Sequence, residues 1–517
     1  GMALLGRGRD AEAVFARVIV MPLVRASLSL GRLDEGGPRG SCRNLPSLLR
    51  DLAADVARRH GDALVLAECT FGGGARGAAR PGPDLVAGGV WAPVAAALTS
   101  GVGVRTAVFS PGIAGTLRAN YRALDDFLGG LAAALLADPG GTDDATTDDA
   151  GADGGAIDDD DDDDFPEFAA HRFRPTATSD NIASSQLRIE NHPATADFYR
   201  KWNLPIYYQI RFGAACARLD TAIEAVRTDG WTASCFTGSK EAARTATDLG
   251  LELPAFQELH DAISSLWGED VFLRPLTHRF LRGTIQLFGR LCAVVEDGRG
   301  EGGAPPTTGW GAVPQDVAAV AWDLTVLGSC LAGPLLDTAT AATHAHDTRR
   351  ATDDERDALD ALLADALQEA AGAAPPLVHA LWHDTIAGVL TAECAAPLAA
   401  VGGVAATYRM TNRPAPTQPS PFVAAVLRPL AEFDAACASR CPPQVGDAWK
   451  VAVVGAVSDR YARAAEELLG NVKKSEEALQ KRRVRRTGGA AAGALTDGEK
   501  VRLQLLLDYR EFAGAVE

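Results

Sequence analysis

The chain has 517 residues, of which 47% are hydrophobic and 23% are charged, and its formal net charge is -17. This length exceeds what one hydrophobic core supports, so several domains or an elongated array of helices are expected. Twelve aspartates between Thr142 and Phe165 supply most of the negative charge. Because the rest of the chain is not basic, we expect no binding to nucleic acid.

The nine cysteines are scattered along the chain without any C-x-x-C pair. This usage predicts free thiols in a reducing compartment. The first residues do not fit a signal peptide, because Arg17 and Pro22 interrupt the apolar run. Residues 85–104 carry no charge, but their Gly and Ala content and Pro93 favour a buried helix over a membrane span. A cytosolic protein without an intrinsic anchor is predicted.

The first predicted unit is an N-terminal helical bundle over residues 1–137. Apolar residues there recur every three or four positions, which is the spacing of a helix with one buried face. The clearest stripe contains Leu45, Leu48, Leu49, Leu52 and Val56.

The second segment, residues 138–191, is predicted to be a disordered acidic insert. It has seven consecutive aspartates at positions 158–164 and few apolar side chains, so it buries too little surface to offset the entropy of ordering. The spaced acidic pattern of a calcium loop is absent from it.

A central helical unit is predicted over residues 192–300. In the aromatic segment 198–212, Trp202 ends a short helix and Pro205 suits the first turn of the next one. We expect this next helix to bury one face, formed by Ile206, Ile210, Ala214 and Ala217, with Tyr207 and Phe212 beside them. A later helix should bury the stripe of Leu276, Phe280, Leu287, Phe288, Leu291 and Val295.

The last predicted unit is a C-terminal helical bundle over residues 312–517. Helices are expected over 313 onward, 353–371, 376–408, 422–439 and 447–483, with a break at the proline-rich segment NRPAPTQPSP. A heptad-like seam for a two-helix contact is formed by Val457, Tyr461, Ala464, Leu468, Val472, Ser475 and Leu479. Thr496 and Glu499 form a capping box before the final helix. No regular alternation supports a sheet, so the fold class is all-α.

Candidate catalytic or metal-binding residues are few. The best are His344, His346 and Asp347 in one segment and His383 and Asp384 in another. Two histidines at i and i+2 do not share a helix face, and neither group has an identifiable supporting shell. The glycine-rich residues 71–77 lack the frame of a phosphate-binding loop, and no nucleophile elbow occurs. We therefore expect neither an enzyme nor a bound metal or cofactor.

One surface feature suggests binding, a basic cluster near the end of the predicted helix 447–483. Its members are Lys473, Lys474, Lys481, Arg482, Arg483, Arg485 and Arg486. Basic residues at a helix C-terminus complement the helix dipole, which is the structural interpretation. The functional alternatives are contact with anionic lipid headgroups or with an acidic partner helix.

Several segments resemble the second subunit of the conserved oligomeric Golgi (COG) complex, a vesicle-tethering assembly. They occur in the order FYRKWNLPIYYQIRF, LWGEDVFLRPLTHRF, YRMTNRPAPTQPSPFVAAVLRPL, NVKKSEEALQKRR and LTDGEKVRLQLLLD. Together they correspond to the middle and C-terminal parts of such a subunit, and the N-terminal coiled coil of the family is not among them.

The resemblance implies an elongated rod of consecutive helical bundles with a non-catalytic role in retrograde intra-Golgi transport. It implies that the partners are other COG subunits, above all one, three and four, with SNAREs, Rab GTPases and coat proteins as further possibilities. The location implied is the cytosolic face of Golgi membranes, with peripheral attachment through the complex. The alternatives are a subunit of another tether such as exocyst, or a helical scaffold of unassigned role.

Overall fold

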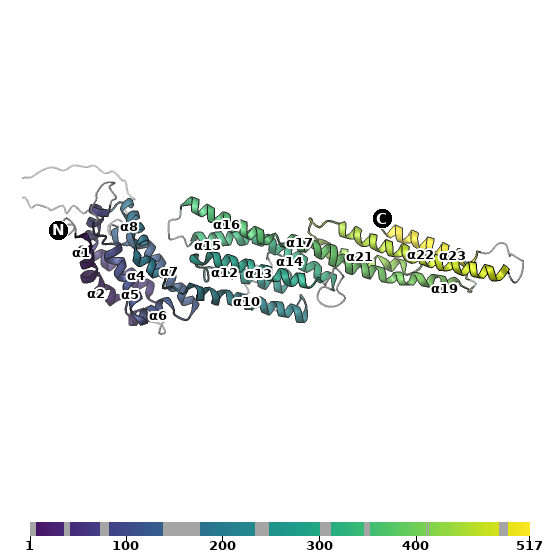
Figure 1. Cartoon of the computed structure of the whole chain (residues 1–517), viewed down its shortest axis with the longest axis horizontal. Coiled ribbons are helices and arrows are strands. Elements are labelled where there is room, and N and C mark those ends of the chain that lie inside the picture. The colour runs from purple at the N-terminus through teal and green to yellow at the C-terminus, as the bar shows by residue number, and fades with distance from the viewer. Residues whose placement is uncertain are drawn as a thin grey trace, which may run out of the picture. The chain divides into compact units, whose positions relative to one another are not determined.

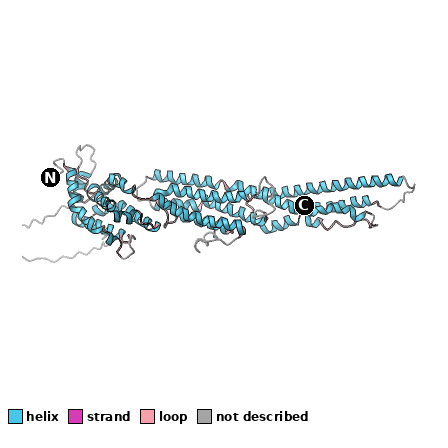
Figure 2. Cartoon of the chain, turned by 60° about the horizontal axis from the view of Figure 1, so that its bottom comes forward, coloured by secondary structure: helices cyan, strands magenta, loops and turns pink. Residues whose placement is uncertain are grey.

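The computed structural model describes residues 7–35, 42–72, 82–137, 176–232, 248–299, 312–345, 352–409, 411, 413–484 and 495–516. Within these ranges every regular element is a helix and no strand occurs (Figures 1 and 2). The predicted all-α class is therefore confirmed. The chain divides into two compact units, unit 1 within Gly1–Ile210 and unit 2 within Arg211–Glu517. The finer division into four segments stays a prediction.

Unit 1 is a helical bundle built around two 23-residue helices, α4 and α7, which pack against each other. Its elements are α1 (Gly8–Val14), η1 (Phe15–Val20), α2 (Met21–Ser27), α3 (Leu30–Leu33), α4 (Leu45–Ala67), η2 (Glu68–Gly72), η3 (Ala87–Trp91), α5 (Ala92–Ser100), α6 (Val102–Phe109), α7 (Ala114–Leu136), α8 (Ser179–Asn191) and α9 (Pro193–Tyr199). The predicted stripe of α4 is buried from Leu45 to Val56, and α7 packs beside it. Spacing alone therefore located this face correctly.

Residues 85–104, which the sequence analysis weighed as a membrane span, lie inside unit 1. Val90, Trp91, Val94 and Leu98 are at most 1% exposed, as expected for a buried helix. By length and composition, two stretches of the described residues are apolar enough to cross a membrane, Pro314–Ala345 and Asp353–Tyr408, and a third candidate is a pair of helices bent by 94° at residue 101.

Residues 179–191 were predicted to belong to the disordered insert, and this is wrong, because they form α8. Thr178 caps the helix by accepting a hydrogen bond from the backbone N–H of Asn181 at 3.3 Å. Ile189 is fully buried, and α8 packs against α7. The acidic composition ends at Asp164, and the predicted disordered segment was continued beyond it to residue 191. The aspartate run itself lies outside the described residues.

Trp202 is a core residue, as predicted, but its partners belong to unit 1. Its ring centroid lies 4.7 Å from that of Phe109 and 5.1 Å from that of Tyr121. Phe198 contacts Phe109 and Trp91 in the same cluster, with centroids 5.4 and 5.3 Å apart. The aromatic segment thus completes the core of unit 1 and not that of the predicted 192–300 unit.

Helix α10 (Leu204–Asp229) exists as predicted, but its buried face differs from the expected one. Ile206 and Ile210 are each 49% exposed, and Ala214 and Ala217 are also exposed. The buried residues are Tyr207, Ala215, Leu219, Ala222, Ile223 and Val226. Two apolar stripes compete on this helix, and the stripe with the larger side chains removes more apolar surface from water.

Unit 2 is a second all-helical bundle. Its elements after α10 are α12 (Pro254–Trp267), η4 (Arg274–Leu276), α13 (Thr277–Asp297), α14 (Pro314–Ala332), α15 (Pro334–Ala345), α16 (Asp353–Ala371), α17 (Ala374–Ala380), η6 (Leu381–Ile386), α18 (Ala387–Ala395), η7 (Ala396–Gly403), α19 (Val404–Tyr408), α20 (Val423–Val426), α21 (Arg428–Cys437), η8 (Ala438–Arg440), α22 (Ala448–Val484) and α23 (Asp497–Val516). The predicted stripe of α13 is buried throughout. The predicted helix 422–439 is divided into α20 and α21, with Pro429 in the first turn of α21.

Candidate interaction surface

The predicted basic cluster lies on the C-terminal half of α22 and beyond its end. Lys473 and Lys474 are exposed on the helix. The positions of Lys481, Arg482 and Arg483 are helical, but their side chains are outside the description, and Arg485 and Arg486 lie outside the described residues. Glu476 and Glu477 lie three residues after the two described lysines. Glu476 also binds Arg502 of α23 at 3.0 Å. The described part of the cluster is therefore a mixed charged surface.

Helices α22 and α23 pack side by side, as Figure 1 shows at the C-terminal end of the colour scale. The predicted seam of α22 is buried at Val457, Tyr461 and Leu468, and the ring of Tyr461 meets that of Phe512 at 5.4 Å. The seam prediction is wrong at its last two positions, Ser475 and Leu479, which are exposed.

The start of α23 has the predicted capping box. The backbone N–H of Glu499 donates to Thr496 Oγ1 at 3.2 Å, and the backbone N–H of Thr496 donates to Glu499 Oε2 at 2.8 Å. These bonds satisfy two donors at the helix N-terminus and fix where α23 begins.

A buried polar cluster fastens α23 to the proline-rich segment. The carboxylate of Asp508, which is fully buried, accepts hydrogen bonds from the backbone N–H of Ser420 at 2.6 Å and from its hydroxyl at 2.8 Å. Gln504 accepts a hydrogen bond from the Tyr408 hydroxyl at 2.7 Å and donates to the Gln418 carbonyl at 2.9 Å. We call these residues the α23 clasp.

The α23 clasp explains how residues 413–421 keep one path although no helix forms there. An ionised carboxylate is costly to bury unless hydrogen bonds replace its water, and Asp508 has three such bonds, the third from Gln504 at 2.8 Å. The sequence pattern did not predict this cluster. A signal was available, because Asp508 falls between Leu505 and Phe512 on the buried stripe of α23.

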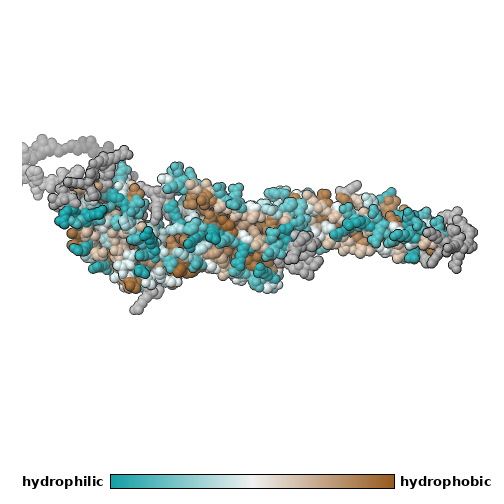
Figure 3. Space-filling model, viewed as in Figure 1, coloured by the Kyte–Doolittle hydropathy of each residue, from teal (hydrophilic) through white to brown (hydrophobic). Residues whose placement is uncertain are grey.

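An apolar groove of about 320 Å³ runs between α22 and α23. From α22 it is lined by Ser458, Tyr461, Ala462 and Ala465, and from α23 by Leu505, Tyr509, Phe512, Ala513 and Val516. Burial raises the pKa of Tyr461, to which the nearby charge of Asp508 also contributes. Figure 3 shows apolar residues mixed with polar ones on the visible face of this part of unit 2.

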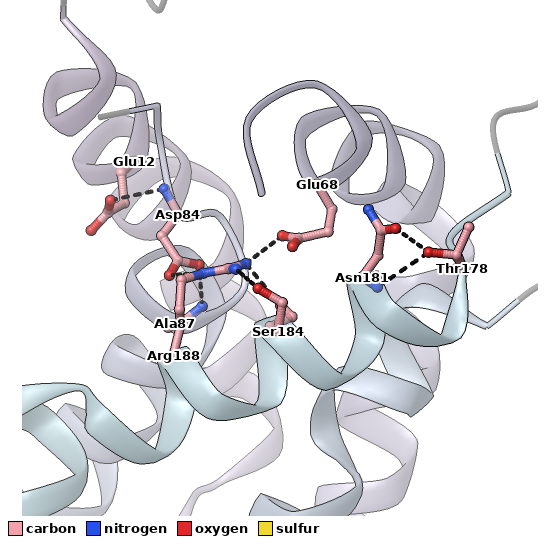
Figure 4. A network of polar contacts seen from close by, with 9 residues as sticks. Glu12, Glu68, Asp84, Ala87, Thr178, Asn181, Ser184 and Arg188 are labelled. Atoms are coloured by element: carbon pink, nitrogen blue, oxygen red, sulfur yellow. Dashed lines mark hydrogen bonds and ion pairs between the residues drawn. The ribbon is translucent and has the colours of Figure 1, made fainter. Parts of the chain in front are cut away.

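In unit 1, a second polar cluster holds α8 against the N-terminal helices (Figure 4). Arg188 donates to Glu68 Oε2 at 2.5 Å and to Asp84 Oδ2 at 2.9 Å. Asp84 in turn accepts from the backbone N–H of Ala87 at 2.9 Å and donates its own backbone N–H to Glu12 at 3.2 Å. Because its members join α1, η2, η3 and α8 and face one another, we assign this cluster a structural role.

The histidine candidates are not brought together. His344 Nε2 lies 3.1 Å from Asp360, whereas His383 stacks on His379 with centroids 4.0 Å apart. Asp384 binds Arg299 at 2.7 Å, and His346 and Asp347 lie outside the described residues. Over the described ranges, no group of three or more His, Cys, Asp or Glu side chains could hold a metal ion.

Comparison with known proteins gives one consistent match. The family described as "COG complex component, COG2, C-terminal" matches residues 200–509, a range that begins two residues before Trp202 and ends one residue after Asp508. Both ends of the α23 clasp are therefore inside the matched region.

The relatives carry the same description, conserved oligomeric Golgi complex subunit 2. The chain is 26% identical over 343 residues to that of Arabidopsis thaliana, which covers 64% of this chain and 43% of the relative. The match to the Homo sapiens protein is 24% identical and covers 64% and 46%, and that to the Drosophila melanogaster protein is 25% identical and covers 61% and 43%. The chain thus spans less than half of the length of these relatives. No solved structure matches it. Because the family model covers more than half of the chain, the chain belongs to the family of COG complex subunit 2.

Proposed function

We propose that this chain acts as a non-catalytic subunit of a Golgi vesicle-tethering complex, as a protein–protein scaffold in retrograde intra-Golgi transport. The family match over residues 200–509 is the observation that carries the proposal. The same match does not favour the alternatives, a subunit of exocyst or a helical scaffold of unassigned role.

The way the described chain uses its buried polar groups supports a scaffold. Asp508 and Arg188 bind backbone groups, a hydroxyl or opposite charges on neighbouring segments, and none of these contacts leaves a reactive pair open to substrate. Such contacts fix the faces that helices present. A scaffold of this kind gains affinity when several weak contacts engage at once, because each contact raises the effective concentration for the next.

The partners in this proposal are other COG subunits, with subunits one, three and four first, and then SNAREs, Rab GTPases and coat proteins. The proposed location is the cytosolic face of Golgi membranes, with peripheral attachment through the complex. Nucleic acid is not a proposed partner, because the net charge of the chain is -17.

The basic cluster is proposed as one contact of this scaffold, with an acidic partner or with anionic headgroups. Lys473 and Lys474 supply its exposed described part. The double variant K473E/K474E separates the two, because flotation with anionic vesicles reports lipid contact and recovery of partner subunits reports protein contact. If K473E/K474E floats with anionic vesicles and recovers partner subunits as well as the unchanged chain does, the cluster has no binding role.

The test of the proposed function is affinity capture of the tagged chain from its own cells, with identification of the co-purifying proteins by mass spectrometry. Recovery of the other COG subunits in stoichiometric amounts is expected. Recovery of exocyst subunits, or of no partner, would overturn the proposal. SNAREs or Rabs recovered without COG subunits would also contradict it, because they would make the chain a free effector.

A further inference from the structure

Helix α22 carries a second apolar stripe in addition to the seam that packs inside unit 2. Its members follow one another at steps of four and three residues: Val451, Gly455, Ser458, Ala462, Ala465 and Leu469. None of them is buried, and Val451 is 71% exposed. Alternating steps of four and three place residues on one line along a helix, which is the pattern that packs against another helix.

Helix α23 has a matching second stripe. Leu506, Tyr509, Ala513 and Val516 are spaced by three, four and three residues, and Leu506, Tyr509 and Val516 are 45%, 62% and 45% exposed. The buried stripe of the same helix, with Val501, Leu505 and Phe512, already packs inside unit 2. Two neighbouring helices therefore each leave one apolar line without a partner among the described residues.

The two stripes meet at the apolar groove between α22 and α23. The α22 wall is made of small side chains, Ala462 and Ala465, whereas α23 contributes the large rings of Tyr509 and Phe512. Small residues on one wall let a third helix approach closely, and large residues on the other wall give it surface to cover. The hollow is partly open to solvent and lies between two neighbouring helices, so it suits a third helix better than a small molecule.

The charges beside the groove differ between its two edges. On α22, Asp459 precedes Ala462 by three residues and Glu466 follows it by four, so both exposed carboxylates flank this edge. Arg463 lies one residue further round the helix and donates to the Asp459 carbonyl at 3.2 Å.

On α23, Arg510 precedes Ala513 by three residues and is exposed, and Arg502 lies one turn before Leu506. Arg502 is half exposed and is paired with Glu476 of α22. The α22 edge is thus acidic and the α23 edge is basic. A helix seated between them is complementary if it carries basic residues on one side of its apolar stripe and acidic residues on the other.

We propose that the groove between α22 and α23 binds one amphipathic helix of a partner protein, with basic residues along one flank of its apolar stripe and acidic residues along the other. The groove wall from Leu505 to Val516 fits a helix of about 12 residues, about 18 Å long. The apolar positions of the partner are large aliphatic residues where they face Ala462 and Ala465. This inference does not depend on the proposed tethering role.

The test uses the full chain in its own cells, with the photoreactive amino acid p-benzoylphenylalanine at Ala462 or at Ala513, one on each wall. After irradiation, the cross-linked peptides are sequenced. Both positions are expected to capture the same peptide of another protein, with apolar residues every three or four positions and opposite charges on its two flanks.

Substitutions make the test specific to the groove. Tyr509→Glu, at an exposed position, is expected to reduce the cross-link yield at Ala462 at least tenfold. Leu362→Glu on α16 is the matched control, because Leu362 is 57% exposed and lies outside the groove, and it should leave the yield unchanged.

Four results would overturn the proposal: capture of a second copy of this chain, capture of lipid, no cross-link at either position, or an undiminished yield in the Tyr509→Glu chain. Capture of COG subunits by the tagged chain is a separate readout. A negative cross-linking result therefore leaves the proposed function intact, and a failed affinity capture leaves the groove proposal intact.

Discussion

The carboxylate of Asp323 on α14 accepts a hydrogen bond from the backbone N–H of Leu253 at 2.7 Å, and its other oxygen accepts one from the N–H of Glu252 at 2.9 Å. Leu253 is the residue that precedes α12, and its own side chain cannot cap the helix. Asp323, on another helix and 70 residues further along the chain, therefore caps the two backbone N–H groups that directly precede the first turn of α12. This contact couples the start of α12 to the middle of α14.

Asp323→Ala should destabilise unit 2 by about 2 to 3 kcal/mol, because it leaves two backbone donors without their acceptor. Urea unfolding of the full chain, followed by the far-UV circular dichroism signal, measures this. Asp357→Ala on α16 is the control, since Asp357 is exposed and should change stability by less than about 0.5 kcal/mol. Equal effects of the two substitutions would contradict the capping role.

The pH dependence of stability should also change at Asp323. Burial raises its pKa from 3.8 to about 7, outweighing the two backbone hydrogen bonds and the nearby charge of Arg440. A raised folded-state pKa means that folding takes up a proton, so this contribution is fully present below about pH 4 and is lost as the pH rises towards 7.

The difference in unfolding free energy between the wild-type chain and Asp323→Asn measures this contribution. It should fall as the pH rises from 4 to 7 and should be flat above that range. A difference that is constant over the whole range would mean that Asp323 is ionised throughout.

Helix spacing predicted most of the local structure, because one buried stripe per helix is a local property. The stripes of α4 and α13 were located correctly, and the boundary of α23 followed from Thr496 and Glu499. The buried face of α10 was assigned wrongly, because its sequence carries two stripes and only the neighbouring helices decide between them.

The polar contacts could not be predicted in the same way. Arg188 and Glu68 are 120 residues apart, and Ser420 and Asp508 are 88 apart. Nothing in either local sequence indicates which distant partner a charged residue finds. The groove between α22 and α23 was also missed, although both of its stripes can be read from the sequence, because an exposed apolar stripe looks the same as a buried one.

Trp202 and Ile206 allow a direct comparison of a buried position with an exposed one. Trp202→Ala should destabilise unit 1 by about 3 to 5 kcal/mol, because it removes a ring that is 5% exposed and contacts Phe109 and Tyr121. Ile206→Ala should cost less than about 1 kcal/mol, because Ile206 is 49% exposed. Thermal unfolding monitored by tryptophan fluorescence and by circular dichroism distinguishes them. A larger loss of stability for Ile206→Ala than for Trp202→Ala would support the buried face of α10 that spacing predicted.

Removing Arg188 should destabilise unit 1 by about 3 to 5 kcal/mol, because Glu68 is 5% exposed and would keep an uncompensated charge. The double variant Arg188→Leu/Glu68→Leu should recover much of this loss, since the buried carboxylate of Glu68 is then removed and the arginine is lost only to the part-exposed Asp84. Arg200→Ala serves as the control, because its ion pair with Asp197 is exposed and should contribute less than about 1 kcal/mol. If the double variant is no more stable than Arg188→Leu, the charge of Glu68 is not the cause.

The α23 clasp should control the mobility of residues 413–421 as well as stability. Asp508→Ala removes the acceptor of the Ser420 backbone N–H and should destabilise unit 2 by about 3 kcal/mol. Tyr408→Phe removes one neutral hydrogen bond to Gln504 and should cost about 1 kcal/mol. Hydrogen exchange measured by mass spectrometry on the peptide that contains Ser420 should speed up in the first variant more than in the second.

Glu511→Ala is the matched control for Asp508→Ala, because Glu511 lies on the same helix and is exposed. It should leave both the exchange of this peptide and the unfolding free energy unchanged. If the Ser420 peptide exchanges at the wild-type rate in Asp508→Ala while α23 loses protection, the carboxylate stabilises the helix but does not fasten the proline-rich segment. Faster exchange confined to the proline-rich segment would show that Asp508 joins this segment to α23, as the contacts with Ser420 indicate.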